Sequence, residues 1–166
     1  YAIGTNALRN NTTGNNNVAM GYQALNAVTT NGDNIAIGHE ALEKNTAAGN
    51  VAIGKRALEE NTSGERNTAV GRSALEANTT SGDNTAIGFQ AMSFLTAGGN
   101  CTAVGSEALA DSSLTGTNNN AFGYQIRNYL LNRSDLGSVK GMPTANAVFD
   151  QLNVKKLLLS RKSKLN

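Results

Sequence analysis

Small and bulky apolar residues recur along the chain in a fixed order, at intervals close to seventeen residues. The interval is marked by a row of glycines, which lie 16 to 18 residues apart at positions 4, 21, 38, 54, 71, 88, 105 and 123. Alanine stands two positions before each of these glycines, and a larger apolar residue stands between the two. Self-similarity at one short period indicates a repeat protein, in which each unit packs on its neighbours.

Each unit contributes an alanine, a larger apolar residue and a glycine to the predicted repeat core. For the complete units these residues are Ala19, Met20, Gly21, Ala36, Ile37, Gly38, Ala52, Ile53, Gly54, Ala69, Val70, Gly71, Ala86, Ile87, Gly88, Ala103, Val104 and Gly105. The glycine allows a positive φ and therefore a sharp corner after the apolar pair.

The segment 34–38 predicts a short strand bounded by turn residues. Successive side chains of a strand point to opposite faces, so Ile35 and Ile37 share one face and Ala36 occupies the other. Both faces are apolar, so we expect one to fill the unit and the other to meet a partner chain. We place the alanines at the partner contact, where a small side chain lets another backbone approach. A bulky residue at Ala52 or Ala69 should then break assembly.

In the first seven units the second half begins with alanine three residues after the glycine, followed by leucine, or by methionine at Met92. The segment 40–44 has the composition of a helical turn, and it suits a second short strand equally well. An Asn-Thr segment such as Asn45-Thr46 then closes the unit as a turn.

Stacking the units in register aligns one asparagine from each. The predicted ladder contains Asn17, Asn34, Asn50, Asn67 and Asn84, bonded from one unit to the next. Cys101 takes the place of asparagine in the following unit, and Asn100 precedes it, which suggests a local bulge. We expect the Cys101 thiol to be buried rather than reactive.

The pattern ends after Gly123, because Ile126 and Arg127 stand where alanine and leucine would be expected. The chain therefore divides into a repeat domain (1–125), a linker (126–142) and a helical connector or the start of a trimeric helical bundle (143–166). Pro143 suits the first turn of that helix. The predicted fold class is all-β: a parallel β-roll or β-solenoid with coils of about seventeen residues, with or without short helical turns, followed by a short C-terminal α-helix.

The composition predicts that the chain forms an oligomer. Only 5% of the residues are aromatic, so a single coil of this length encloses little core, and oligomerisation is the usual remedy.

The charge is unevenly distributed along the chain. Residues 1–125 carry six Lys/Arg against ten Asp/Glu, and residues 126–166 carry eight against two. We interpret the basic end as a solvated helix or linker and expect no nucleic-acid partner. No apolar run is long enough to span a membrane, and the chain begins within a repeat, as a fragment of a longer protein would.

Two stretches carry a resemblance to known proteins. Segments such as Asn84-Thr85-Ala86-Ile87-Gly88 resemble the head repeats of trimeric autotransporter adhesins, although the present unit is longer. Gly21-Tyr22-Gln23-Ala24-Leu25 is similar to the repeat arrays of phage tail fibres. The resemblance covers residues 1–125. It implies a left-handed parallel β-roll in which three chains pack around an axis, intertwined or side by side.

Candidate chemistry is sparse. His39 stands alone as a histidine, and the position that follows each glycine, which it occupies, holds Tyr22, Lys55, Arg72 and Phe89 in other units. We interpret these five residues as an exposed face available for binding. We find no catalytic set and expect no cofactor or metal, so a fibre-borne polysaccharide-degrading enzyme is disfavoured.

The sequence therefore predicts a structural and adhesive homotrimer. We interpret the chain first as the shaft or receptor-binding region of a phage tail fibre, located in the virion. Its partners would be other fibre or baseplate proteins and a host cell-surface receptor or glycan. The alternative is the head of a trimeric adhesin on a bacterial cell surface.

Overall fold

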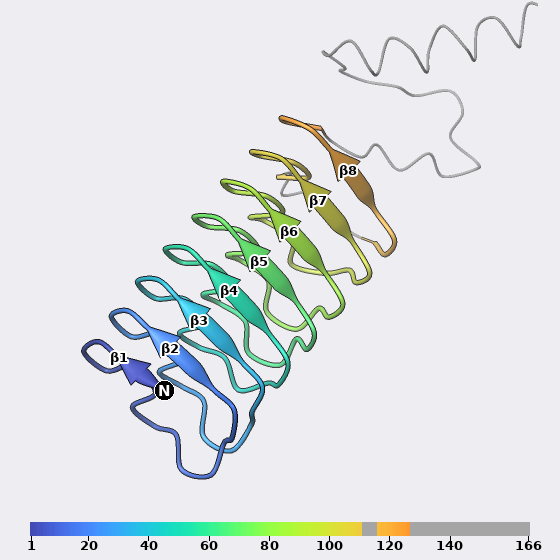
Figure 1. Cartoon of the computed structure of the whole chain (residues 1–166). Coiled ribbons are helices and arrows are strands. Elements are labelled where there is room, and N and C mark those ends of the chain that lie inside the picture. Colours follow the sequence, from blue (N-terminus) through green and yellow to red (C-terminus); the bar gives the residue numbers. More distant parts are fainter. Residues whose placement is uncertain (111–115, 127–166) are drawn as a thin grey trace, which may run out of the picture. The chain divides into compact units, whose positions relative to one another are not determined.

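A computed structural model of the chain describes residues 1–110 and 116–126. In these residues the chain winds into a β-solenoid, whose coils stack one on another (Figure 1). Each coil contributes one short strand to a single parallel sheet. The strands are β1 (Ala2–Ile3), β2 (Val18–Met20), β3 (Ile35–Ile37), β4 (Val51–Ile53), β5 (Thr68–Val70), β6 (Thr85–Ile87), β7 (Thr102–Val104) and β8 (Asn120–Phe122).

The strands follow the repeat without a slip in register. Ala36 of β3 pairs with Ala19 on one side and Ala52 on the other, so alanine stacks on alanine along the sheet. The spacing of 16 residues between Gly38 and Gly54 does not disturb this pairing. The missing residue falls in the turn after Thr46, where a loop absorbs a change in length without moving the strands. The parallel β-solenoid with coils of about seventeen residues is thus confirmed, and the described residues contain no helix.

The segment that follows each strand forms hydrogen-bonded turns, and is neither a helix nor a second strand. Glu40 and Leu42 have φ angles of 59° and 52°, in the left-handed region. That conformation costs roughly 1–2 kcal/mol for a residue with a side chain. Burying a leucine contributes about 1.5–3 kcal/mol, and Leu42 is fully buried. The turn therefore places a large apolar side chain in a coil that is too short for a regular helix.

The strand alanines lie inside the coil, which corrects the sequence-based assignment of the two faces. Ala36, Ala52 and Ala69 have no exposed surface in the single chain. They pack in one core cluster with the turn alanines and leucines, such as Leu58. The interior is narrow because leucine already enters it from the turn, so only a methyl group fits at the centre of the strand. Ala52 and Ala69 accordingly contact their own coil rather than a partner.

The predicted asparagine ladder is confirmed, and its geometry is specific. The side-chain Oδ1 of Asn34 accepts the backbone N–H of Asn50 at 3.0 Å, and Asn50 Oδ1 accepts the N–H of Asn67 at 2.9 Å. The ladder continues to Cys101, whose N–H donates to Asn84 Oδ1 at 3.0 Å. Cys101 is buried, as predicted.

The bulge expected at Asn100 does not occur. Thr102 pairs with Thr85 in the ordinary register, so Cys101 aligns with Asn84. Asn100 has a φ of 55°, and Asp83 has a φ of 60° at the matching position one coil earlier. Asparagine tolerates the left-handed conformation of this turn position, and the coil needs no extra residue.

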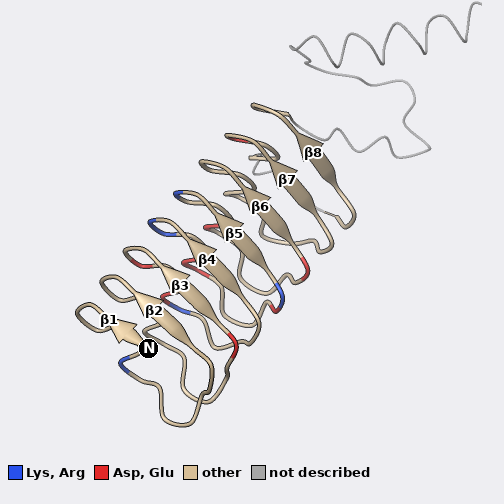
Figure 2. Cartoon of the chain, in the orientation of Figure 1, with Lys and Arg blue, Asp and Glu red and all other residues tan. Residues whose placement is uncertain are grey.

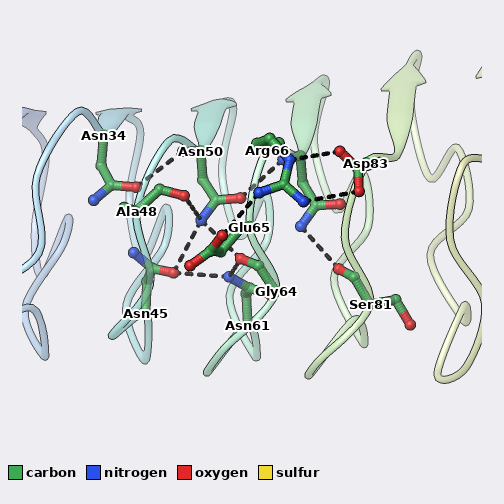
Figure 3. A network of polar contacts seen from close by, with 11 residues as sticks. Asn34, Asn45, Ala48, Asn50, Asn61, Gly64, Glu65, Arg66, Ser81 and Asp83 are labelled. Atoms are coloured by element: carbon green, nitrogen blue, oxygen red, sulfur yellow. Dashed lines mark hydrogen bonds and ion pairs between the residues drawn. The ribbon is translucent and has the colours of Figure 1, made fainter.

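A second row of buried asparagines lies beside the first (Figure 3). Asn61 Nδ2 donates to Asn45 Oδ1 at 2.7 Å, and Asn78 Nδ2 donates to Asn61 Oδ1 at 3.0 Å. The row ends where Leu95 replaces asparagine. Asn78 Oδ1 is then buried without a hydrogen-bond donor, because the next coil supplies no amide. The sequence showed these residues as turn formers, whereas the structure gives them a place in the core.

The linker predicted at 126–142 lies outside the described residues except for Ile126, and the C-terminal helix predicted at 143–166 lies outside them entirely. The part of the chain that the structure describes holds no helix long and apolar enough to cross a membrane.

Candidate interaction surface

The outer face of the sheet carries the larger apolar residues of the strands. We call the row formed by the last residue of each strand the outer stripe: Ile3, Met20, Ile37, Ile53, Val70, Ile87, Val104 and Phe122. Ile37, Ile53 and Ile87 are 36%, 38% and 41% exposed. These residues were predicted as repeat core, but the alternation of the strand turns them away from the coil interior, which the alanines occupy.

A second outward row lies beside the outer stripe and changes in character along the rod. It is apolar in the first coils, at Val18, Ile35 and Val51, and then consists of Thr68, Thr85 and Thr102. The strands hold no charged residue, and Figure 2 shows the charges confined to the loops between them. The outer face is therefore a continuous uncharged surface along the sheet, widest in apolar area from β2 to β4.

A parallel sheet with an uncovered apolar face is unusual, because parallel sheets are ordinarily covered on both sides. Scattered apolar residues on a surface need no explanation, but a contiguous apolar patch marks an interaction site. The outer stripe meets this criterion, because its members stack directly on one another through the strand register, as Ile37 does on Ile53.

The corner glycines fix the edge of this surface. Gly54 has a φ of +134°, and a Cβ added to it would lie 2.6 Å from the carbonyl carbon and oxygen of Gly71 in the next coil. Both the angle and the contact exclude a side chain. The chain turns sharply at each corner, and the residue that follows the glycine stands at the rim of the outer face.

The five residues predicted as an exposed binding face occupy this rim, and all five are exposed. We call Tyr22, His39, Lys55, Arg72 and Phe89 the rim row. The rings of Tyr22 and His39 stack with centroids 5.0 Å apart and planes at 29°. The guanidinium of Arg72 lies over the Phe89 ring at 5.8 Å from its centroid. The structure thus brings four of the five into pairwise contact across neighbouring coils.

Charged residues of the neighbouring turns are tied into ion pairs. Arg56 contacts Glu59 and Glu76, and Arg66 binds Asp83 at 2.7 Å. The hydrogen bond from Arg66 holds the pKa of the Asp83 carboxyl below its usual value. Burial, followed by repulsion from Glu40 and Glu59, raises the pKa of Glu43. The Arg56–Glu76 and Arg66–Asp83 pairs link successive coils, and each exposed pair contributes little to stability.

The Nδ1 atom of His39 lies 3.1 Å from Oε2 of the Glu40 carboxylate. In the described part of the chain, no group of three or more histidine, cysteine, aspartate or glutamate side chains is placed to hold a metal ion.

The comparisons with known proteins give no relative for this chain: no family model, no curated protein and no solved structure matches it.

Proposed function

We propose that this chain is a structural and adhesive segment of a homotrimeric fibre, acting as the shaft or receptor-binding region of a phage tail fibre in the virion. The observation that supports it is the outer stripe, an uncharged apolar face that runs from β1 to β8 and that none of the residues in 1–110 and 116–126 covers. A second and a third copy would cover it. The number three comes from the resemblance of the repeats to trimeric fibre and adhesin arrays.

The shape of the interior supports the same proposal. The coils enclose rows of alanine, leucine and asparagine. The largest apolar side chains that are fully buried in the described coils are leucines, Met92 and Val28. Such a thin core gains stability when apolar surface on the outside is also removed from water, at about 25 cal/mol per Å². Trimer assembly through the outer stripe would bury side chains that are now a third or more exposed, such as Ile37 and Ile87.

The head of a trimeric adhesin on a bacterial surface is the alternative, because it would use the same rod and the same apolar face. Immunogold labelling separates the two. Antibodies raised against the purified rod should label tail fibres on virions released by the organism that encodes the chain. Label on the bacterial surface instead would favour the adhesin, and label on neither would contradict both.

We propose that the rod acts by binding and not by catalysis. Incubation of the purified chain with capsular polysaccharide from the host should release no new reducing ends. Release of oligosaccharides at a rate proportional to protein concentration would overturn this part of the proposal.

A further inference from the structure

The rim row presents its side chains in coil order. Each residue follows a corner glycine, so one rim residue stands on each coil, and neighbouring coils lie about 4.8 Å apart in a parallel sheet. The stacked pair Tyr22–His39 and the cation–π pair Arg72–Phe89 show that neighbouring rim side chains lie alongside one another. Between these pairs stands Lys55. The row thus reads aromatic, aromatic, cation, cation, aromatic along five successive coils.

Lys55 and Arg72, the two cations of the row, form no ion pair with a carboxylate of the described residues. Within residues 1–110 and 116–126, Lys44, Arg56 and Arg66 all form ion pairs with carboxylates. Lys55 and Arg72 form none there, and the contact recorded for Arg72 is with the Phe89 ring. Two adjacent unpaired cations on one rim are therefore free to receive an anionic group.

We propose that the rim row binds an anionic glycan, with a carboxylate or sulfate group held between Lys55 and Arg72 and sugar rings packed against the flanking aromatic residues. The planar guanidinium of arginine forms paired hydrogen bonds with such oxyanions. The apolar surface of Tyr22 and Phe89, which are 43% and 41% exposed, suits the C–H face of a sugar ring. This inference rests on the proposed fibre function and names the class of receptor that the rod would recognise.

The charge around the row favours a sparsely charged glycan over a nucleic acid. A nucleic-acid strand carries one phosphate per 3.4 Å or so of its length. It would bring phosphates against Glu40, which lies beside His39, as well as against the two cations. Residues 1–125 carry six Lys/Arg against ten Asp/Glu, which repels a dense polyanion. A glycan with acidic groups separated by neutral sugars meets the cations and avoids this repulsion.

Calorimetric titration of the full chain at low ionic strength tests the inference. The probes are oligosaccharides of hyaluronan, which is carboxylated, and of chondroitin sulfate, which is also sulfated, with neutral chitin oligosaccharides and oligo(dT) for comparison. We expect at least one anionic glycan to bind about tenfold or more tightly than both the chitin oligosaccharides and oligo(dT). The double variant Lys55→Gln/Arg72→Gln should weaken that binding by about tenfold or more.

The double variant Lys44→Gln/Arg66→Gln is the matched control, because it removes the same charge from cations that are already paired. It should leave binding within about twofold, since exposed ion pairs contribute little. The inference is overturned if neither anionic glycan binds, if the control variant loses as much affinity, or if oligo(dT) binds as tightly. Light scattering on the same samples keeps the two proposals apart. A trimer that binds no glycan contradicts this inference alone, and a monomer contradicts the proposed assembly.

Discussion

At the residue scale, the hydrogen bonds of the buried asparagines are expected to contribute to the stability of the fold. Asn50 Oδ1 is the acceptor for the buried backbone N–H of Asn67, and Asn50 Nδ2 donates to the carbonyl oxygen of Gly64 at 2.9 Å. A buried donor without a partner costs about 1–3 kcal/mol. Both rows of asparagine are therefore part of the core, although their side chains are polar.

We expect Asn50→Ala to lower the free energy of unfolding by about 1–3 kcal/mol, because the Asn67 N–H loses its acceptor. Urea denaturation followed by circular dichroism measures the change. Asn10→Ala is the control, since the Asn10 side chain is exposed and donates to Asn26 at the surface. Equal stability of the two variants would show that the ladder is dispensable.

The Glu43 carboxyl gives a second prediction at this scale. Its pKa is raised by burial and then by Glu40 and Glu59, so the folded chain binds the proton more tightly than the unfolded chain. The resulting destabilisation is absent below the ordinary glutamate pKa and appears as the pH rises through the raised value. Glu43→Gln should therefore raise the melting temperature at pH 7 and leave it nearly unchanged at pH 3. An unchanged melting temperature at pH 7 would contradict the assignment.

At the scale of the element, the sequence predicted the strand, the corner glycine and the period, because these recur in every unit. It did not predict which strand face lies inside. Ala36 and Ile37 are both apolar, and alternation alone does not assign them. The width of the coil interior decides which face is buried. That width is limited by Leu42, which enters the interior from the turn. The turn has a left-handed backbone, which the amino-acid composition does not predict.

The corner itself can be tested with two glycines. Gly54 has a φ of +134° and no room for a Cβ, whereas Gly49 has a φ of +72° and its nearest neighbour atom at 3.8 Å. We expect Gly49→Ala to cost about 1–2 kcal/mol for the left-handed conformation alone. Gly54→Ala should cost more, because the carbonyl of Gly71 must also move. Chemical denaturation of both variants measures the difference, and an equal cost would argue against close packing of the corners.

At the scale of the whole molecule, the outer stripe is the surface through which we propose that the rod associates. The rim row is exposed, as expected, because its residue type varies between aromatic and basic from unit to unit, whereas the strand alanine is the same in every unit. The outer stripe was assigned to the repeat core, and its exposure in the single chain follows from the narrow interior. Within the described residues, the apolar face left exposed is the isoleucine face, and the alanine face is buried inside the coil.

A glutamate on this face should separate assembly from folding. Ile53→Glu places a charge in the proposed interface and leaves the coil interior intact, so we expect a folded chain of lower molar mass. Phe94→Glu makes the same change at an exposed apolar residue outside the stripe and should keep the wild-type mass. Sedimentation velocity and circular dichroism together measure both properties. Loss of mass in both variants, or in neither, would contradict assembly through the outer stripe.

The molar mass of the full wild-type chain in solution tests the central claim most directly. Size-exclusion chromatography with multi-angle light scattering should give three times the 17.2 kDa of one chain, independent of concentration over the micromolar range. A mass of 17.2 kDa, with the β-sheet signal intact, would contradict the account, because the outer stripe would then be stable in water without a partner.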